Sequence, residues 1–186
     1  PQPATDALQQ RLGYVEPIFN ASMAGAAGGS LAAAVSAAGG FGMLGIGGND
    51  TKEWIDQQSE LAASASLPWG AGLMAWVLEK SLDPLHQVLA HGPSFICISF
   101  GEPGPAAAAV HEAGVWVGMQ GGNAAELERA VQSDIDVVIC RGSEGGGSGA
   151  GEGDRRHPGP VGPVEHHELG LAGADHDIDV LETAWQ

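Results

Sequence analysis

A glycine-rich stretch from Gly142 to Gly149 has the composition and position best suited to chemistry in this chain. It directly follows a short apolar run that ends at Cys140, so it leaves the end of a predicted strand. Glycines at such a place let the backbone approach a ligand, and consecutive amides can cradle an anion or a ring carbonyl. The stretch therefore predicts a ligand-binding loop. A flexible Gly/Ser linker is the alternative interpretation.

The other motifs give weaker evidence for a functional site. Gly40-x-Gly42-x-x-Gly45 formally matches a dinucleotide fingerprint, but it enters a strand instead of leaving one for a helix. His166 and His167 lie in an acidic stretch without metal-ligand spacing, so we expect no metal site. Cys97 and Cys140 each lie in an apolar run, which indicates buried thiols in a reducing compartment.

Composition narrows the class of protein. A chain of 186 residues fits one domain, and 44% hydrophobic residues is typical of a globular protein. A formal net charge of −16 repels phosphate backbones and anionic lipid, so we expect neither nucleic acid nor a membrane as partner. Pro1–Tyr14 lacks the apolar centre of a signal peptide, and no apolar stretch is long enough to cross a bilayer. We therefore expect a cytoplasmic protein, of unknown oligomeric state.

The elements that must position the glycine loop recur along the chain. Short apolar runs alternate with helical stretches at intervals of roughly 20 to 30 residues, the spacing of strand-plus-crossover-helix units. The predicted strands are Pro17–Ser22, Phe41–Ile46, Ala71–Val77, Phe95–Phe100, Val115–Met119 and Ile135–Cys140. They carry apolar residues on both sides rather than alternating, as expected where both sheet faces are buried. This predicts an α/β fold with a parallel sheet; periodicity alone leaves a barrel and a doubly wound sheet open.

The repeating pattern stops after Cys140. We place a boundary near Gly151, which divides the chain into a partial barrel or sheet over residues 1–150 and a flexible or atypical acidic tail over residues 151–186. Ile178–Leu181 is the one candidate for further sheet in that tail, and it is a weak one.

Five segments, in order, resemble the nitronate monooxygenase (2-nitropropane dioxygenase-like) family. They cover Pro17 to Gly149 and lie at the family's separations. The segments are Pro17–Gly25, Leu31–Gly42, Trp69–Met74, Ser99–Pro103 and Arg141–Gly149.

The resemblance implies a TIM-type β/α barrel that holds FMN at the carboxyl ends of its strands. The implied activity is oxidation of alkyl nitronates by molecular oxygen, with the protein positioning the flavin. Related members reduce enoyl thioesters with NAD(P)H, and the fold cannot separate the two activities. The family pattern places the cofactor-binding residues at Met23, Gly72, Arg141, Gly146 and Gly147.

Two departures from the family pattern keep other interpretations open. Ser148 stands where the family has its active-site histidine, and a serine hydroxyl cannot by itself take a proton near neutral pH. The residues after Gly151 do not resemble the family, so about six of eight strands are expected, in a truncated or altered barrel. The alternatives are a non-catalytic truncated barrel with weak or no flavin binding and, less favoured, an acidic interaction module.

Overall fold

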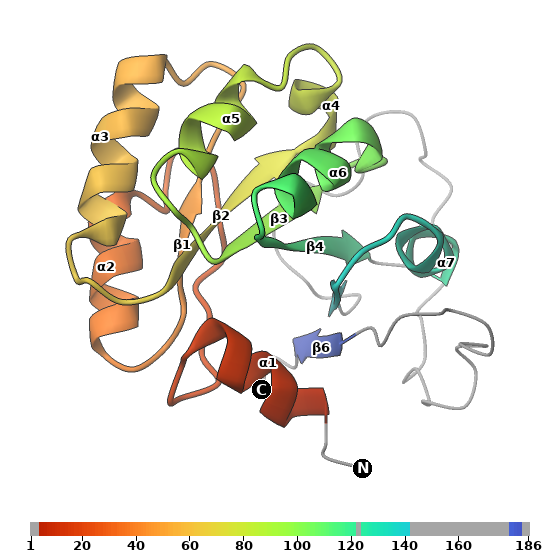
Figure 1. Ribbon diagram of the computed structural model, residues 1–186, viewed down its shortest axis with the longest axis horizontal. Coiled ribbons are helices and arrows are strands. Elements are labelled where there is room, and N and C mark those ends of the chain that lie inside the picture. Colours follow the sequence, from red (N-terminus) through yellow and green to blue (C-terminus); the bar gives the residue numbers. More distant parts are fainter. Residues whose placement is uncertain (1–3, 122–123, 142–178, 184–186) are drawn as a thin grey trace.

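The computed structural model describes residues 4–121, 124–141 and 179–183, which form a curved parallel sheet with helices around it (Figure 1). The helices are α1 (Ala4–Leu12), α2 (Gly29–Ala37), α3 (Lys52–Ala63), α4 (Ala75–Leu78), α5 (Asp83–Leu89), α6 (Gly104–Glu112) and α7 (Ala124–Gln132). The strands are β1 (Gly42–Gly45), β2 (Trp69–Met74), β3 (Phe95–Ser99), β4 (Trp116–Gly121), β5 (Val137–Arg141) and β6 (Asp179–Thr183).

The six described strands follow one another in chain order, and every neighbouring pair is parallel. Sequential parallel strands joined by helices are the arrangement of a β/α barrel wall. The predicted α/β class with a parallel sheet is confirmed, and the described strands form part of a TIM-type barrel.

Successive residues of each strand point to opposite faces and join different cores. In β3, Ile96 and Ile98 pack outward in the cluster that joins the strands to the surrounding helices. Phe95 and Cys97 pack inward, in a second cluster inside the curve of the sheet. Burial on both faces explains why the strands carry apolar residues on both sides.

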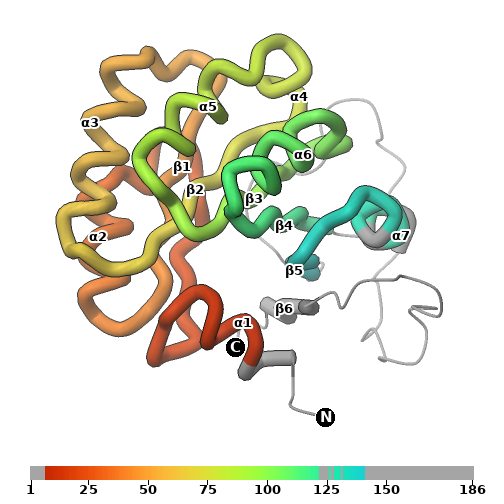
Figure 2. The backbone as a smooth tube through the Cα atoms, in the orientation of Figure 1, coloured from red at the N-terminus to blue at the C-terminus, as the bar shows by residue number. Residues whose placement is uncertain are grey.

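Helix α1 covers the inside of the curve at the amino ends of the strands. Leu8 and Leu12 are buried there against Phe41, Phe95 and the first residue of β5. Figure 1 shows α1 beside β6. Residues of α2 and α3 belong to the outer cluster and those of α1 to the inner one, and Figure 2 shows α1 apart from these two helices. The sequence analysis does not predict this helix; its two buried leucines are spaced four residues apart, so both face the barrel interior.

Four of the predicted strands differ from the structure by one or two residues at their ends, and the other two differ more. Pro17–Ser22 makes one parallel bridge, between Phe19 and Phe41, and forms no longer strand. The strand predicted as Ala71–Val77 begins earlier and ends at Met74, because α4 starts at the next residue.

The described part of the predicted acidic tail is β6, which pairs in parallel with β5 and overlaps the weak candidate Ile178–Leu181. The boundary near Gly151 lies outside the described residues and stays a proposal.

Candidate functional site

The carboxyl ends of the strands bring the candidate residues together on the inside of the sheet, as expected for the active face of a β/α barrel. The strand registers place one row of inward neighbours side by side. This row consists of Gly45, Gly72, Cys97, Gly118 and Val137. Two residues further toward the carboxyl ends lie Met74, Ser99 and Gln120, which form the rim of the barrel mouth.

The segment from Asn20 to Ala27 lies across this inner wall at the ends of β1 and β2. A Cβ built on Gly45 would lie 2.5 Å from the carbonyl carbon of Met23. A Cβ built on Gly72 would overlap the hydroxyl oxygen of Ser22. Glycine is therefore required at both strand positions, because another chain segment occupies the space of their missing side chains.

Hydrogen bonds fix this segment to β1. The Asn20 side-chain amide donates to the Met43 carbonyl and accepts from the Met43 amide, each at 2.8 Å. Further along, the Gly45 amide donates to the Ala27 carbonyl at 2.8 Å, and the Ala27 amide donates to the Met23 carbonyl, also at 2.8 Å. Both ends of the segment are thus tied to the same strand, which holds Ser22 and Met23 at the mouth.

The rim offers polar groups from two neighbouring strands. Ser99 ends β3 and is buried, and its hydroxyl oxygen lies 3.8 Å from the Cys97 sulfur. Gln120 is half-buried near the end of β4. A hydroxyl and an amide there can both donate and accept hydrogen bonds to a ligand in the mouth.

Large apolar side chains remain exposed directly after the ends of β2 and β3 and in the segment that lies across the inner wall. Met23 is 55% exposed, Trp76 43% and Phe100 38%. Phe100 also has a φ of 62°, a left-handed conformation that is uncommon for an aromatic residue. Lone exposed apolar residues need no explanation, but their grouping on the loops at one edge of the sheet is typical of a ligand-binding face.

Of the residues that the family resemblance predicts, three lie within the described part of the chain and three lie outside it. Met23 and Gly72 lie together at the mouth, through the contact of Ser22 with Gly72. Arg141 ends β5 at the same edge, where its backbone pairs with Thr183. Gly146, Gly147 and Ser148 lie outside the described residues.

Asn20, Ser22, Ser99 and Gln120 were not predicted as site residues, although the first three lie in segments that resemble the family. Asn20 and Ser22 are single polar residues in a segment without periodicity. The other two are recognised only once the register shows which strand residues face inward.

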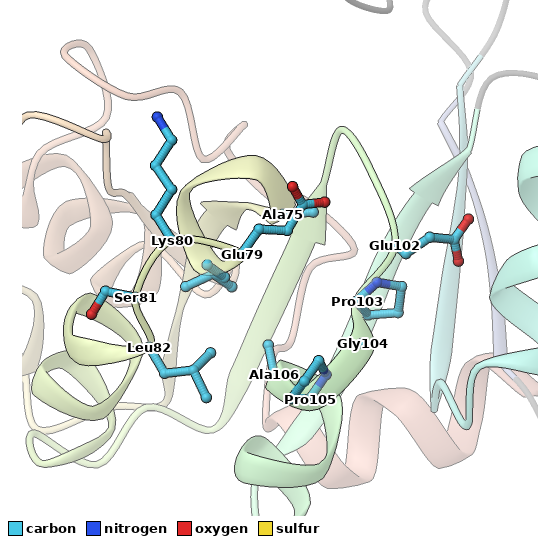
Figure 3. Close-up of a pocket in the computed structure, with 11 residues that line it drawn as sticks. Ala75, Glu79, Lys80, Ser81, Leu82, Glu102, Pro103, Gly104, Pro105 and Ala106 are labelled. Atoms are coloured by element: carbon cyan, nitrogen blue, oxygen red, sulfur yellow. The ribbon is translucent and has the colours of Figure 1, made fainter.

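A groove of about 500 Å³ lies beside the mouth, between the turn that joins α4 to α5 and the start of α6. Figure 3 shows Glu79 and Glu102 on its two sides, with Leu82 and Ala106 toward its floor. Glu102 accepts from the Arg129 guanidinium at 2.8 Å, which ties α7 to the loop after β3. The groove lies among the outer helices, so it is separate from the inward-facing candidate site.

Within the described ranges, no three His, Cys, Asp or Glu side chains gather in a way that could hold a metal ion. Nor does any described helix combine the length and apolarity needed to cross a membrane.

Neither a scan against protein-family models nor a search of curated proteins finds a match. Among solved structures, FabK from Thermotoga maritima matches with 26% identity and a TM-score of 0.64, over 73% of this chain and 43% of that one. Nitroalkane oxidase from Streptomyces ansochromogenes matches with 22% identity and a TM-score of 0.60, over 73% of this chain and 48% of that one.

The chain thus spans less than half the length of either relative. The likeness to nitroalkane oxidase shows a shared fold. The match to FabK shows the same fold at a higher sequence identity. Together they confirm the resemblance that the ordered motifs indicated. Over the aligned part of its length, this chain is a structural relative of FabK and of nitroalkane oxidase.

Proposed function

We propose that this chain is the FMN-binding part of an oxidoreductase that oxidises alkyl nitronates with molecular oxygen. The observation that carries the proposal is the packing of residues 20–27 over Gly45 and Gly72. This packing fixes Met23, with an exposed side chain, at the carboxyl edge of the sheet. Bound FMN would supply the redox chemistry, taking up electrons from the nitronate and passing them to oxygen.

The described residues fit one side of a flat heteroaromatic ring. The exposed Met23 side chain offers a soft apolar surface for a ring to lie against. Ser99 and Gln120 offer hydrogen-bonding groups to the ring's polar edge. Because Gly45 has no side chain, residues 20–27 can pack directly against β1.

Three further roles belong to the proposal by family resemblance. Arg141, at the end of β5, would bring positive charge toward the flavin in place of a neutral amide donor. The amides of Gly146 and Gly147 would hold the cofactor, and Ser148 would stand at the family's histidine position. The substrate is a small molecule, and the barrel wall together with residues 20–27 would shield it from water.

Flavin titration of the full chain tests the proposal. Added FMN should lose fluorescence on binding, and its visible absorption band should shift. Met23→Ala should weaken FMN binding, whereas Leu31→Ala, which truncates a similarly exposed residue on α2, should leave it unchanged. A full chain that leaves both signals unchanged at high FMN concentration would refute the proposal.

A non-catalytic chain with weak or no flavin binding is the second candidate, favoured by Ser148 in place of the histidine. Such a chain binds FMN weakly or not at all in the titration and gives no nitronate-dependent oxygen uptake. An enoyl-thioester reductase is the third candidate, and the match to FabK keeps it in view. It would oxidise NAD(P)H in the presence of an enoyl thioester and would consume no oxygen with a nitronate.

A further inference from the structure

Ser22 and Gly72 share the space of one side chain on the inner wall. The Cβ direction of Gly72 points into the barrel, in the same row as Gly45 and Cys97. A Cβ at that position would overlap the Ser22 hydroxyl oxygen and lie 2.5 Å from the Ser22 Cβ. The Ser22 hydroxyl therefore stands where a side chain carried by β2 would begin.

The Ser22 hydroxyl has no hydrogen-bond partner among the described residues. It is half-buried. Its neighbours are well bonded, since the amide of Met23 donates to the Ala21 carbonyl at 2.9 Å and Asn20 makes two bonds to β1. A hydroxyl that is held in place by its neighbours, and left unused by them, is suited to a ligand.

The position of Ser22 is fixed without any contribution from its own side chain. The Asn20 amide anchors the segment on one side, and the Met23 carbonyl, which accepts from Ala26 and Ala27, anchors it on the other. Replacement of the hydroxyl should therefore change what the mouth can bind and leave the path of the segment unchanged.

We propose that the Ser22 hydroxyl takes the place of a side chain at position 72. At the carboxyl end of β2, this hydroxyl is the group that hydrogen-bonds to the polar edge of a flavin ring. The proposal rests on the proposed function, because it names a residue that would hold the cofactor. It assigns the role to Ser22 rather than to Gly72, whose contribution is to leave room.

The first test is the FMN affinity of Ser22→Ala, measured by fluorescence quenching on the full chain. Loss of one neutral hydrogen bond should weaken binding roughly 3- to 10-fold. The melting temperature of the unliganded variant should equal that of the original chain, because no described bond within the protein is lost. The visible band of bound FMN should also shift, since the band responds to hydrogen bonds at the ring.

The second test moves the hydroxyl from one backbone position to the other. Ser22→Gly alone should weaken FMN binding as Ser22→Ala does. The double variant Ser22→Gly with Gly72→Ser should recover the affinity to within about threefold, because the new side chain fills the same space. Gly72→Ala alone should lower the melting temperature, because its Cβ would overlap Ser22.

These experiments distinguish failure of the Ser22 role from failure of the proposed function. If the original chain does not bind FMN, the proposed function fails and the role of Ser22 fails with it. If the original chain binds FMN and a folded Ser22→Ala variant binds it equally well, the role of Ser22 is refuted and the proposed function stands. Should the double variant fail to fold, Ser22→Ala decides alone.

Discussion

The side-chain amide of Asn20 bonds to both the carbonyl and the amide of Met43, each at 2.8 Å, and so satisfies the two backbone groups that β1 would otherwise present to a neighbouring strand. The segment before it contacts β1 through a single backbone bridge, between Phe19 and Phe41. One side chain thus continues the edge of the sheet where the backbone turns away toward Ser22. This side-chain pairing satisfies the hydrogen-bonding groups of Met43 at the edge of β1. It also directs the chain over the barrel mouth.

Asn20→Ala should reduce both stability and FMN binding. It leaves the Met43 amide and carbonyl without their partner, at a cost of about 1–3 kcal/mol in the free energy of unfolding. For a chain of this size, each kcal/mol lowers the melting temperature by roughly 2–4 °C. Asn20→Asp keeps the acceptor and loses the donor, so it should fall between the two. Calorimetry that finds Asn20→Ala as stable as the original would contradict the pairing.

Ser59→Ala should stabilise the chain. Ser59 lies on α3 and is fully buried, and its hydroxyl has no partner among the described residues. Removal of a buried, unsatisfied hydroxyl should raise the free energy of unfolding by about 1 kcal/mol. Ser64→Ala, at the exposed end of the same helix, is the control, because the Ser64 hydroxyl donates to the Leu61 carbonyl. Denaturant unfolding that shows Ser59→Ala to be less stable than the original would mean that the hydroxyl is bonded.

Helix α1 should be needed for the barrel core. Leu12 is fully buried inside the curve of the sheet, so Leu12→Ala should cost about 2–5 kcal/mol. Leu31→Ala removes the same atoms from an exposed position on α2 and should change stability by less than about 0.5 kcal/mol. Equal urea midpoints for the two variants would show that α1 does not pack as described.

Acid should weaken the contact between α3 and α5 at Asp56. Hydrogen bonds from His91, at 2.8 Å, and from Gln87 hold the pKa of Asp56 below its usual value, His91 contributing most. A carboxyl group with a lowered pKa in the folded state stabilises the fold above its unfolded pKa of about 3.9. That stability is lost as the pH falls through the lower, folded pKa.

The measurement is the melting temperature against pH, from about pH 6 to pH 2.5, for three chains. Asp56→Asn should show a shallower fall on the acid side than the original. Glu60→Gln, an exposed carboxylate on the same helix, is the matched control and should follow the original curve. Parallel curves for Asp56→Asn and the original would exclude Asp56 as a source of the acid dependence.

The parallel sheet is predictable from sequence because its strands are buried on both faces. A run such as Phe95–Phe100 is apolar at every position except Ser99, and it becomes β3 with Phe95 and Cys97 inside and Ile96 and Ile98 outside. The first predicted strand is shorter in the structure, because Asn20 bonds to β1 through its side chain. Sequence patterns do not distinguish side-chain from backbone pairing.

The candidate site is less predictable than the fold. The family motifs point to Met23 and Gly72, but Ser22, Ser99 and Gln120 are single polar residues without a periodic signal. Their roles depend on which residues face inward, and the strand register determines this. The overlap of Ser22 with position 72 is a contact between residues far apart in the sequence, so only the structure shows it.

Ser148→His should raise nitronate turnover if the chain binds FMN. The family resemblance places position 148 at the active site, and an imidazole can accept or donate a proton near neutral pH where a serine hydroxyl cannot. General acid–base catalysis typically contributes about 10²–10⁴-fold, so an increase of at least about tenfold in kcat is expected. Ser143→His introduces the same side chain earlier in the glycine run and should leave turnover unchanged. Oxygen uptake with a primary nitronate measures the rate, and flavin absorbance confirms that each variant is loaded. Equal or lower turnover in a flavin-loaded Ser148→His variant would remove Ser148 from the site and favour a non-catalytic chain.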